Sequence, residues 1–151
     1  MIYSVLFFTL SARGNPTELN EAQQQLVRQL SLRDGAPDCA ELKNGNGQLQ
    51  ADLMVMVNTV KQPPWVGMRA ANCLMTRFPL ESKDTFKMWM SGEQTMGLAY
   101  LLGAQLSQLP DEVAVEVGRA GLSGPYSEGV KTRLESQEGP VIQELLKGED
   151  E

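Results

Sequence analysis

Histidine is absent from the 151 residues of this chain. Without an imidazole the protein cannot build a Ser–His or Cys–His nucleophile pair, and it lacks the commonest transition-metal ligand. Two cysteines cannot complete a four-ligand zinc site, and the glycine-containing stretches GNGQLQA and GLSGP lack the lysine of a phosphate-binding loop. We therefore expect no catalysis and no cofactor or metal. An enzyme that uses carboxylates alone would need Asp and Glu side chains that converge in a pocket.

Basic residues are also scarce. Lys and Arg total 13 against 19 for Asp and Glu, which gives a formal net charge of -6. Binding to a phosphate backbone depends on clustered positive charge. Nucleic acid is therefore not an expected partner.

Long hydrophobic runs are missing as well. The longest apolar stretch, Ile2 to Leu10, is too short to cross a bilayer as a retained helix. It ends in Ser11 and Ala12 before Arg13, so residues 1–14 resemble a secretory signal peptide, although no Lys or Arg precedes the apolar run. We expect a secreted or periplasmic protein with no integral membrane span in the mature chain. The alternative is a cytoplasmic protein whose apolar N-terminal segment packs into its own core.

Cys39 and Cys73 are the two cysteines of the chain. In an exported protein this pair could form a disulfide, which would stabilise the fold by roughly 3 to 4 kcal/mol in the chain-entropy treatment. The alternative is that both are small buried hydrophobic residues. Export therefore favours a disulfide between them.

Most of the chain shows apolar residues at helical spacing, punctuated by proline and glycine. The pattern predicts an all-α protein with a single helical domain over residues 15–147 and an acidic tail at 148–151. Asn15 is the expected cap of the first helix, and Ser91 that of the fifth. The expected helices span residues 15–32, 48–60, 63–77, 84–90, 91–109, 111–120, 127–136 and 140–147, with one helical turn in the loop at 36–47.

Two proline-led segments resemble each other. PPWVGMRAANCL, residues 63–74, and PDEVAVEVGRAGL, residues 110–122, both place Val three positions after a proline and small or apolar residues one and two turns later. Small residues at successive turns let a neighbouring helix approach closely. The offset of roughly 47 residues falls in the range of helical-hairpin repeats.

The first of these segments resembles the second helix of a HEAT repeat, in which Pro is followed by Val, an Ala-Ala pair and Leu. The matching positions are Val66, Ala70, Ala71, Cys73 and Leu74. The resemblance covers roughly residues 48–147. It implies a short right-handed α-solenoid of antiparallel helix pairs that serves as a non-catalytic binding scaffold. An irregular helical bundle is the alternative fold.

Candidate protein-binding residues are Trp65 and the cluster Met88, Trp89 and Met90, because Trp and Met are enriched at protein interfaces. Alternatively, both tryptophans fill gaps between helices. We expect an exported scaffold that binds another protein. The alternative function is that of a cytosolic helical adaptor or regulatory subunit.

Overall fold

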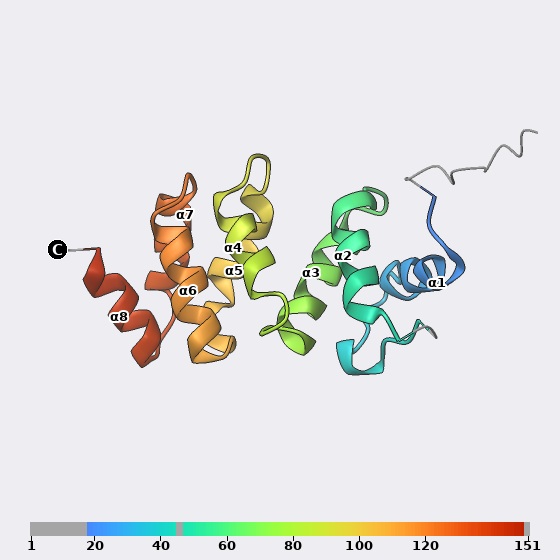
Figure 1. The fold of residues 1–151 in the computed structure, drawn as a ribbon, viewed down its shortest axis with the longest axis horizontal. Coiled ribbons are helices and arrows are strands. Elements are labelled where there is room, and N and C mark those ends of the chain that lie inside the picture. The colour runs from blue at the N-terminus through green and yellow to red at the C-terminus, as the bar shows by residue number, and fades with distance from the viewer. Residues whose placement is uncertain (1–17, 45–46, 150–151) are drawn as a thin grey trace, which may run out of the picture.

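The computed structural model describes residues 18–44 and 47–149 (Figure 1). Within these ranges the chain forms α-helices and 3-10 turns and no strand, which confirms the all-α prediction. The elements in chain order are α1 (Glu21–Leu30), η1 (Cys39–Glu41), α2 (Leu49–Thr59), α3 (Trp65–Arg77), α4 (Lys83–Ser91), α5 (Met96–Ala104), η2 (Leu106–Gln108), α6 (Asp111–Leu122), α7 (Ser127–Glu135) and α8 (Pro140–Gly148).

The first helix begins later than predicted. Residues 18–20 are not helical, and the side chain of Asn20 caps α1 by accepting a hydrogen bond from the backbone N–H of Gln23. The side-chain oxygen of Gln23 in turn accepts a hydrogen bond from the backbone N–H of Asn20, which completes a capping box. The cap predicted at Asn15 lies outside the described residues.

The helix predicted over residues 91–109 is wrong. Ser91 ends α4 instead of capping a new helix, and Gln94 adopts a left-handed backbone with φ of 58° before α5 begins. The break is held by tertiary contacts. The hydroxyl of Tyr126 donates to the carbonyl of Gly92 across 2.8 Å, and the Thr95 hydroxyl donates to the same carbonyl.

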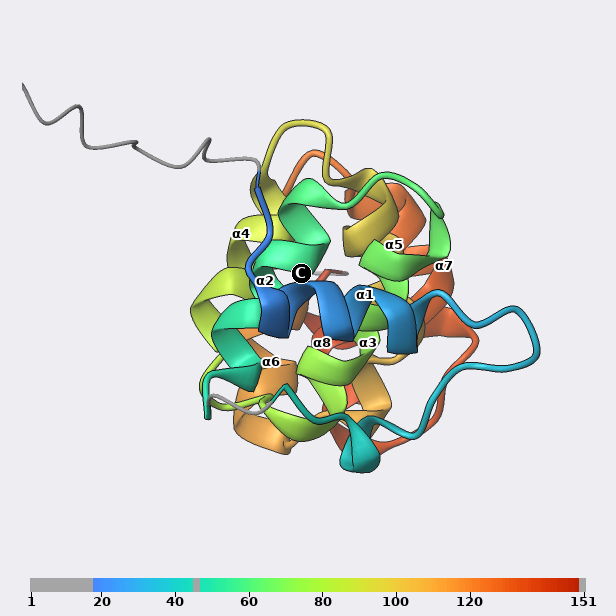
Figure 2. The same ribbon diagram turned by 90° about the vertical axis from the view of Figure 1, so that its right-hand side faces the viewer.

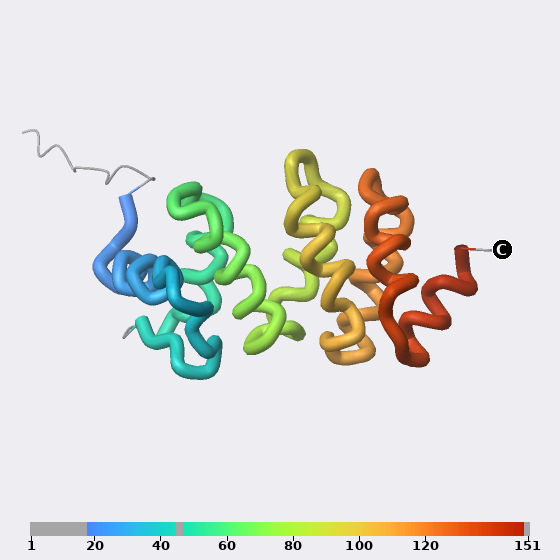
Figure 3. The backbone as a smooth tube through the Cα atoms, turned by 180° about the vertical axis from the view of Figure 1, so that it is seen from behind, coloured from blue at the N-terminus to red at the C-terminus, as the bar shows by residue number. Residues whose placement is uncertain are grey.

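The helices follow one another along the long axis of the molecule, from α1 at one end to α8 at the other (Figures 1 and 3). α2 packs against α3, α4 against α5 and α6 against α7. Along the axis, α4 lies beside α6, α6 beside α8, and α5 beside α7. Viewed nearly down that axis, α5 and α7 lie on one side and α4 on the other (Figure 2). Each helix therefore contacts mainly its near neighbours.

One apolar core runs through these helices. Leu26, Leu53, Leu74, Phe86 and Leu102 are among its fully buried side chains. The proline-led helices both contribute their small-residue faces to it, as the sequence predicted. Their surroundings differ, however: α3 packs mainly against α2, which precedes it, whereas α6 packs mainly against α4 and also against α7 and α8. The likeness between the two segments therefore does not coincide with the pairing of the helices.

The sequence predicts no integral membrane span in the mature chain. None of the helices in residues 18–44 and 47–149 is both long enough and apolar enough to span a bilayer.

Candidate functional site: a stapled helix and its groove

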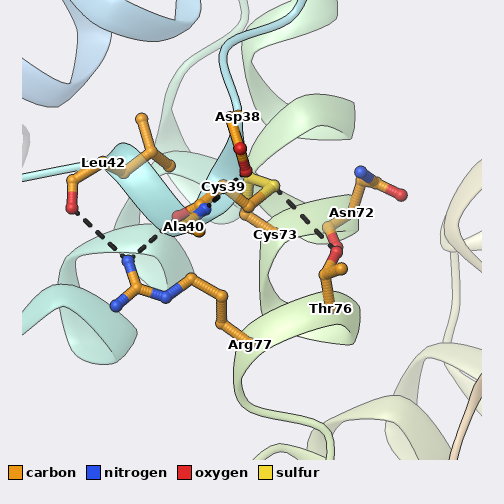
Figure 4. The surroundings of a disulfide bond; sticks show 8 residues. All are labelled: Asp38, Cys39, Ala40, Leu42, Asn72, Cys73, Thr76 and Arg77. Carbon is orange, nitrogen blue, oxygen red and sulfur yellow. Dashed lines mark hydrogen bonds between the residues drawn. A yellow bond between two sulfur atoms is a disulfide. The ribbon is translucent and has the colours of Figure 1, made fainter.

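Cys39 in η1 and Cys73 in α3 are paired in the structure (Figure 4). Their sulfur atoms lie 2.04 Å apart and their Cα atoms 5.2 Å apart. Both residues are buried in the core. The pairing joins the connection between α1 and α2 to the middle of α3 and agrees with the predicted disulfide.

Two arginines lie one helical turn on either side of Cys73 and reach the same connection. The Arg77 guanidinium donates to the backbone carbonyl of Cys39 across 2.9 Å, and at 3.4 Å to that of Leu42 (Figure 4). Residues four apart share a helix face, so Arg69, Cys73 and Arg77 form one stripe, which we call the staple. Neither arginine is among the residues singled out from the sequence above. Their spacing around Cys73 was the available signal.

Arg69 secures the other end of the connection. Its guanidinium donates to the carbonyl of Leu30, the last residue of α1, and to that of Leu32, at 2.9 and 2.6 Å. Carbonyls at a helix C-terminus have no partner within the helix. A cation there also interacts favourably with the negative end of the helix dipole. Arg69 therefore closes α1 while it anchors α1 to α3.

A second polar contact holds the connection against α2. The buried carboxylate of Asp52 accepts hydrogen bonds from the side-chain amides of Asn44 and Gln23. In the described parts of the chain, Asp52 is the one buried carboxylate. Amide donors surround it, and it lines none of the pockets described below. Across residues 18–44 and 47–149, no group of three or more potential metal-ligating side chains comes together.

The predicted tryptophan and methionine cluster separates into core and surface. Trp89 and Met90 are buried, and Trp89 stacks at a tilt on Phe86 with ring centroids 5.3 Å apart. These two residues fill the core between helices, so the prediction that they form a binding face is corrected. Met88, by contrast, exposes 68% of its surface.

Trp65, the other predicted binding residue, is half-buried at the start of α3. The guanidinium of Arg69 lies 5.8 Å from its ring centroid, which is within cation–π range. Together with Arg33 these residues line a shallow pocket of about 430 Å³. The indole Nε1 is buried and has no hydrogen-bond partner among the described residues. The ring therefore serves as an apolar wall next to a cation.

A larger groove of about 480 Å³ lies between α3 and the end of α5. It is lined by Asn72, Met75, Thr76, Pro79, Gln105, Gln108, Leu109 and Pro110. Met75 and Leu109, which are buried, form the apolar part of the lining together with Pro79 and Pro110. No ionisable residue lines this groove, so its polar character comes from amides and one hydroxyl.

The chief ion pairs lie elsewhere, between α4 and α6. Glu116 accepts hydrogen bonds from Lys83 and Lys87 at 3.1 and 3.3 Å. The bond from Lys83, followed by that from Lys87, lowers the pKa of Glu116. The same bond raises the pKa of Lys83. These half-exposed groups link two neighbouring helices and do not line either pocket described above.

No family model, no curated protein and no solved structure matches this chain. The functional interpretation therefore depends on the geometry of the chain itself.

Proposed function

We propose that this chain is an exported, non-catalytic helical scaffold of the HEAT type that binds another protein. The serial packing of helix pairs along one axis is the observation that supports it best. A stack of this kind exposes a long continuous surface, and repeat proteins use such extended surfaces for binding.

The paired cysteines support export. Disulfides persist in oxidising compartments and are rare in the cytosol. The pair is buried, and both neighbouring turns of α3 hold the same segment through Arg69 and Arg77. A structural bridge of this kind fits an extracellular or periplasmic domain. The signal-like residues 1–14, which point the same way, lie outside the described residues.

The outer side of α3 is the proposed binding face. Trp65, Met68, Arg69 and Asn72 follow the helical spacing that places side chains on one side. Met68 is 38% exposed, and Trp65 and Asn72 are half-buried. An aromatic ring, a thioether and a guanidinium side by side make the combination that recurs at binding hot spots. This face replaces the Trp89 and Met90 part of the surface expected from the sequence.

The test is site-specific photo-crosslinking in the native host. A photoreactive amino acid at Met68 should trap a discrete protein, whereas the same amino acid at Glu144 on α8, which is exposed, should not. Capture of one protein at Met68, in the exported fraction, supports the proposal. Absence of any discrete product at Met68 and at the exposed Met88 would contradict it. Capture in the cytoplasmic fraction would favour the cytosolic adaptor instead.

A further inference from the structure

We propose that the groove between α3 and the end of α5 binds the main chain of an extended, uncharged peptide segment of the partner. This inference rests on the proposed scaffold function and names the part of the partner that the groove recognises. It is carried by three side-chain carboxamides that converge on one groove and have no side-chain hydrogen bond to residues 18–44 or 47–149.

The three carboxamides belong to Asn72 on α3 and to Gln105 and Gln108 at the end of α5 and in η2. None of them makes a side-chain hydrogen bond to any residue in the described ranges. Other glutamines of the chain are used internally: Gln29 donates to the carbonyl of Lys43, and Gln137 to that of Gly103. Asn72 directs its carboxamide away from the disulfide (Figure 4).

A carboxamide offers an N–H donor and a C=O acceptor in one plane. In an extended segment the N–H and C=O of one residue point to the same side, so an Asn or Gln side chain can pair with both at once. Recognition through the main chain gives affinity that does not depend on sequence, and pockets for alternate side chains give selectivity. Carboxamides on both sides of the groove can therefore hold a segment whose peptide groups lack partners of their own.

The remaining lining specifies which side chains fit. Met75 and Leu109 are buried beneath the groove and can pack against a small or apolar side chain. Since no Asp, Glu, Lys or Arg lines the groove, a charged side chain placed there would lose hydration without gaining an ionic partner. Successive side chains of an extended segment point to opposite sides, so alternate residues can face this floor.

The groove also occupies a particular place in the fold. The contact of α3 with α5 is one of the places where the segment from α1 to α3 meets the later helices, and the groove lies there. On the other side of Asn72, the neighbouring Cys73 is bonded to Cys39. The staple thus holds the turn of α3 that bears Asn72. This lowers the entropic cost of ordering the Asn72 carboxamide when a peptide binds.

The test uses the full oxidised chain as bait for a display library of random octapeptides, followed by synthesis of the enriched peptides. Enriched sequences should lack charged residues at their centre. On titration, the side-chain NH2 resonances of Asn72, Gln105 and Gln108 should shift, while that of the exposed Gln25 on α1 should not. The Asn72→Ala/Gln105→Ala variant should weaken binding by about tenfold or more, the loss of two hydrogen bonds, and Gln25→Ala should leave it unchanged.

Both variants should fold normally, because the removed groups make no hydrogen bond within the part of the chain that the structure describes, and unchanged thermal unfolding checks this. The inference is overturned if no peptide is enriched, if enriched peptides carry central charges, or if they bind the double variant as well as the parent chain. Should crosslinking at Met68 still capture a partner in any of these cases, the scaffold function stands and the groove assignment alone fails.

Discussion

Arg77 donates a hydrogen bond to the backbone carbonyl of Cys39 across 2.9 Å, although 38 positions separate the two residues. The same carbonyl belongs to the cysteine that is bonded to Cys73, one turn before Arg77 on α3. A charge-assisted hydrogen bond and a covalent bond therefore hold one short turn against one helix. This arrangement makes η1 a fixed part of the fold.

Removal of the disulfide should destabilise the protein markedly. The Cys39→Ala/Cys73→Ala variant should lose about 3 to 4 kcal/mol of unfolding free energy, because the bridge closes a loop of 34 positions in the unfolded chain. Urea unfolding with and without dithiothreitol measures this difference. Reductant should shift the parent chain and leave the variant unchanged. Equal midpoints for the oxidised parent and the variant would contradict a stabilising bridge.

The arginines should stabilise the fold independently of the cysteines. Arg77→Met removes a charged donor from the carbonyls of Cys39 and Leu42, and should cost about 1 to 2 kcal/mol because the guanidinium is partly exposed to water. Arg28→Met on α1, an exposed position whose side chain has no hydrogen bond or ion pair to the described residues, should change stability by less than about 0.5 kcal/mol. Chemical unfolding of both variants makes the comparison. Equal effects would show that the Arg77 bonds contribute nothing.

Truncation of two adjacent residues of α4 should change the stability of the fold to very different extents. Trp89→Ala should cost about 3 to 5 kcal/mol because the ring is buried against Phe86. Met88→Ala should stay within about 0.5 kcal/mol because its side chain is largely in water. Thermal unfolding of the two variants compares them directly. A stable Trp89→Ala protein with impaired binding would restore this tryptophan to the binding face.

Two glycines form a second matched pair. A Cβ at Gly124 would lie 2.7 Å from the backbone oxygen of Met90 and 2.9 Å from that of Ala120, so Gly124→Ala should cost about 1 to 3 kcal/mol. A Cβ at Gly97 in α5 meets nothing within 4 Å, and Gly97→Ala should be neutral or stabilising by up to about 1 kcal/mol. Calorimetry of the two variants tests this difference. Equal melting temperatures would show that the backbone of Met90 and Ala120 can move away to accommodate a Cβ at Gly124.

The ion pairs of Glu116 predict a modest dependence on pH. Because the pKa of Glu116 is lowered, the stabilisation is present above its ordinary value of 4.5 and is lost as the pH falls through the folded-state pKa. The raised pKa of Lys83 keeps the pair intact below 10.5, and the contribution is lost as the pH rises through the folded-state value. The stability difference between parent and Glu116→Gln should therefore be largest near pH 7 and shrink at pH 3 and in high salt. Glu144→Gln serves as the control, and a difference that does not vary with pH would contradict the pairing.

The sequence predicted six of the helices to within two residues, because their ends carry local signals. Proline precedes or begins α3, α6 and α8, and apolar residues then recur at helical spacing. The break between α4 and α5 was missed because it depends on Tyr126, whose hydroxyl reaches Gly92 from 34 positions away. Contacts of that range leave no mark in the local pattern.

The candidate site was only partly predictable. Cys39 and Cys73 could be paired because they are the two cysteines of the chain. The targets of Arg69 and Arg77 could not be predicted, since a backbone carbonyl carries no sequence signature. The burial of Trp89 could have been found: Phe86 and Met90 lie three positions before it and one after, so the three share the inward face of α4.

The most direct test of an exported, disulfide-stapled scaffold is the intact mass of the protein isolated from its native host, alkylated with and without prior reduction. An exported scaffold of this kind should lack roughly the first twelve residues, and its cysteines should react only after reduction. A full-length chain with two freely alkylated cysteines would contradict export and the bridge together, and would direct the search for a partner to the cytoplasm.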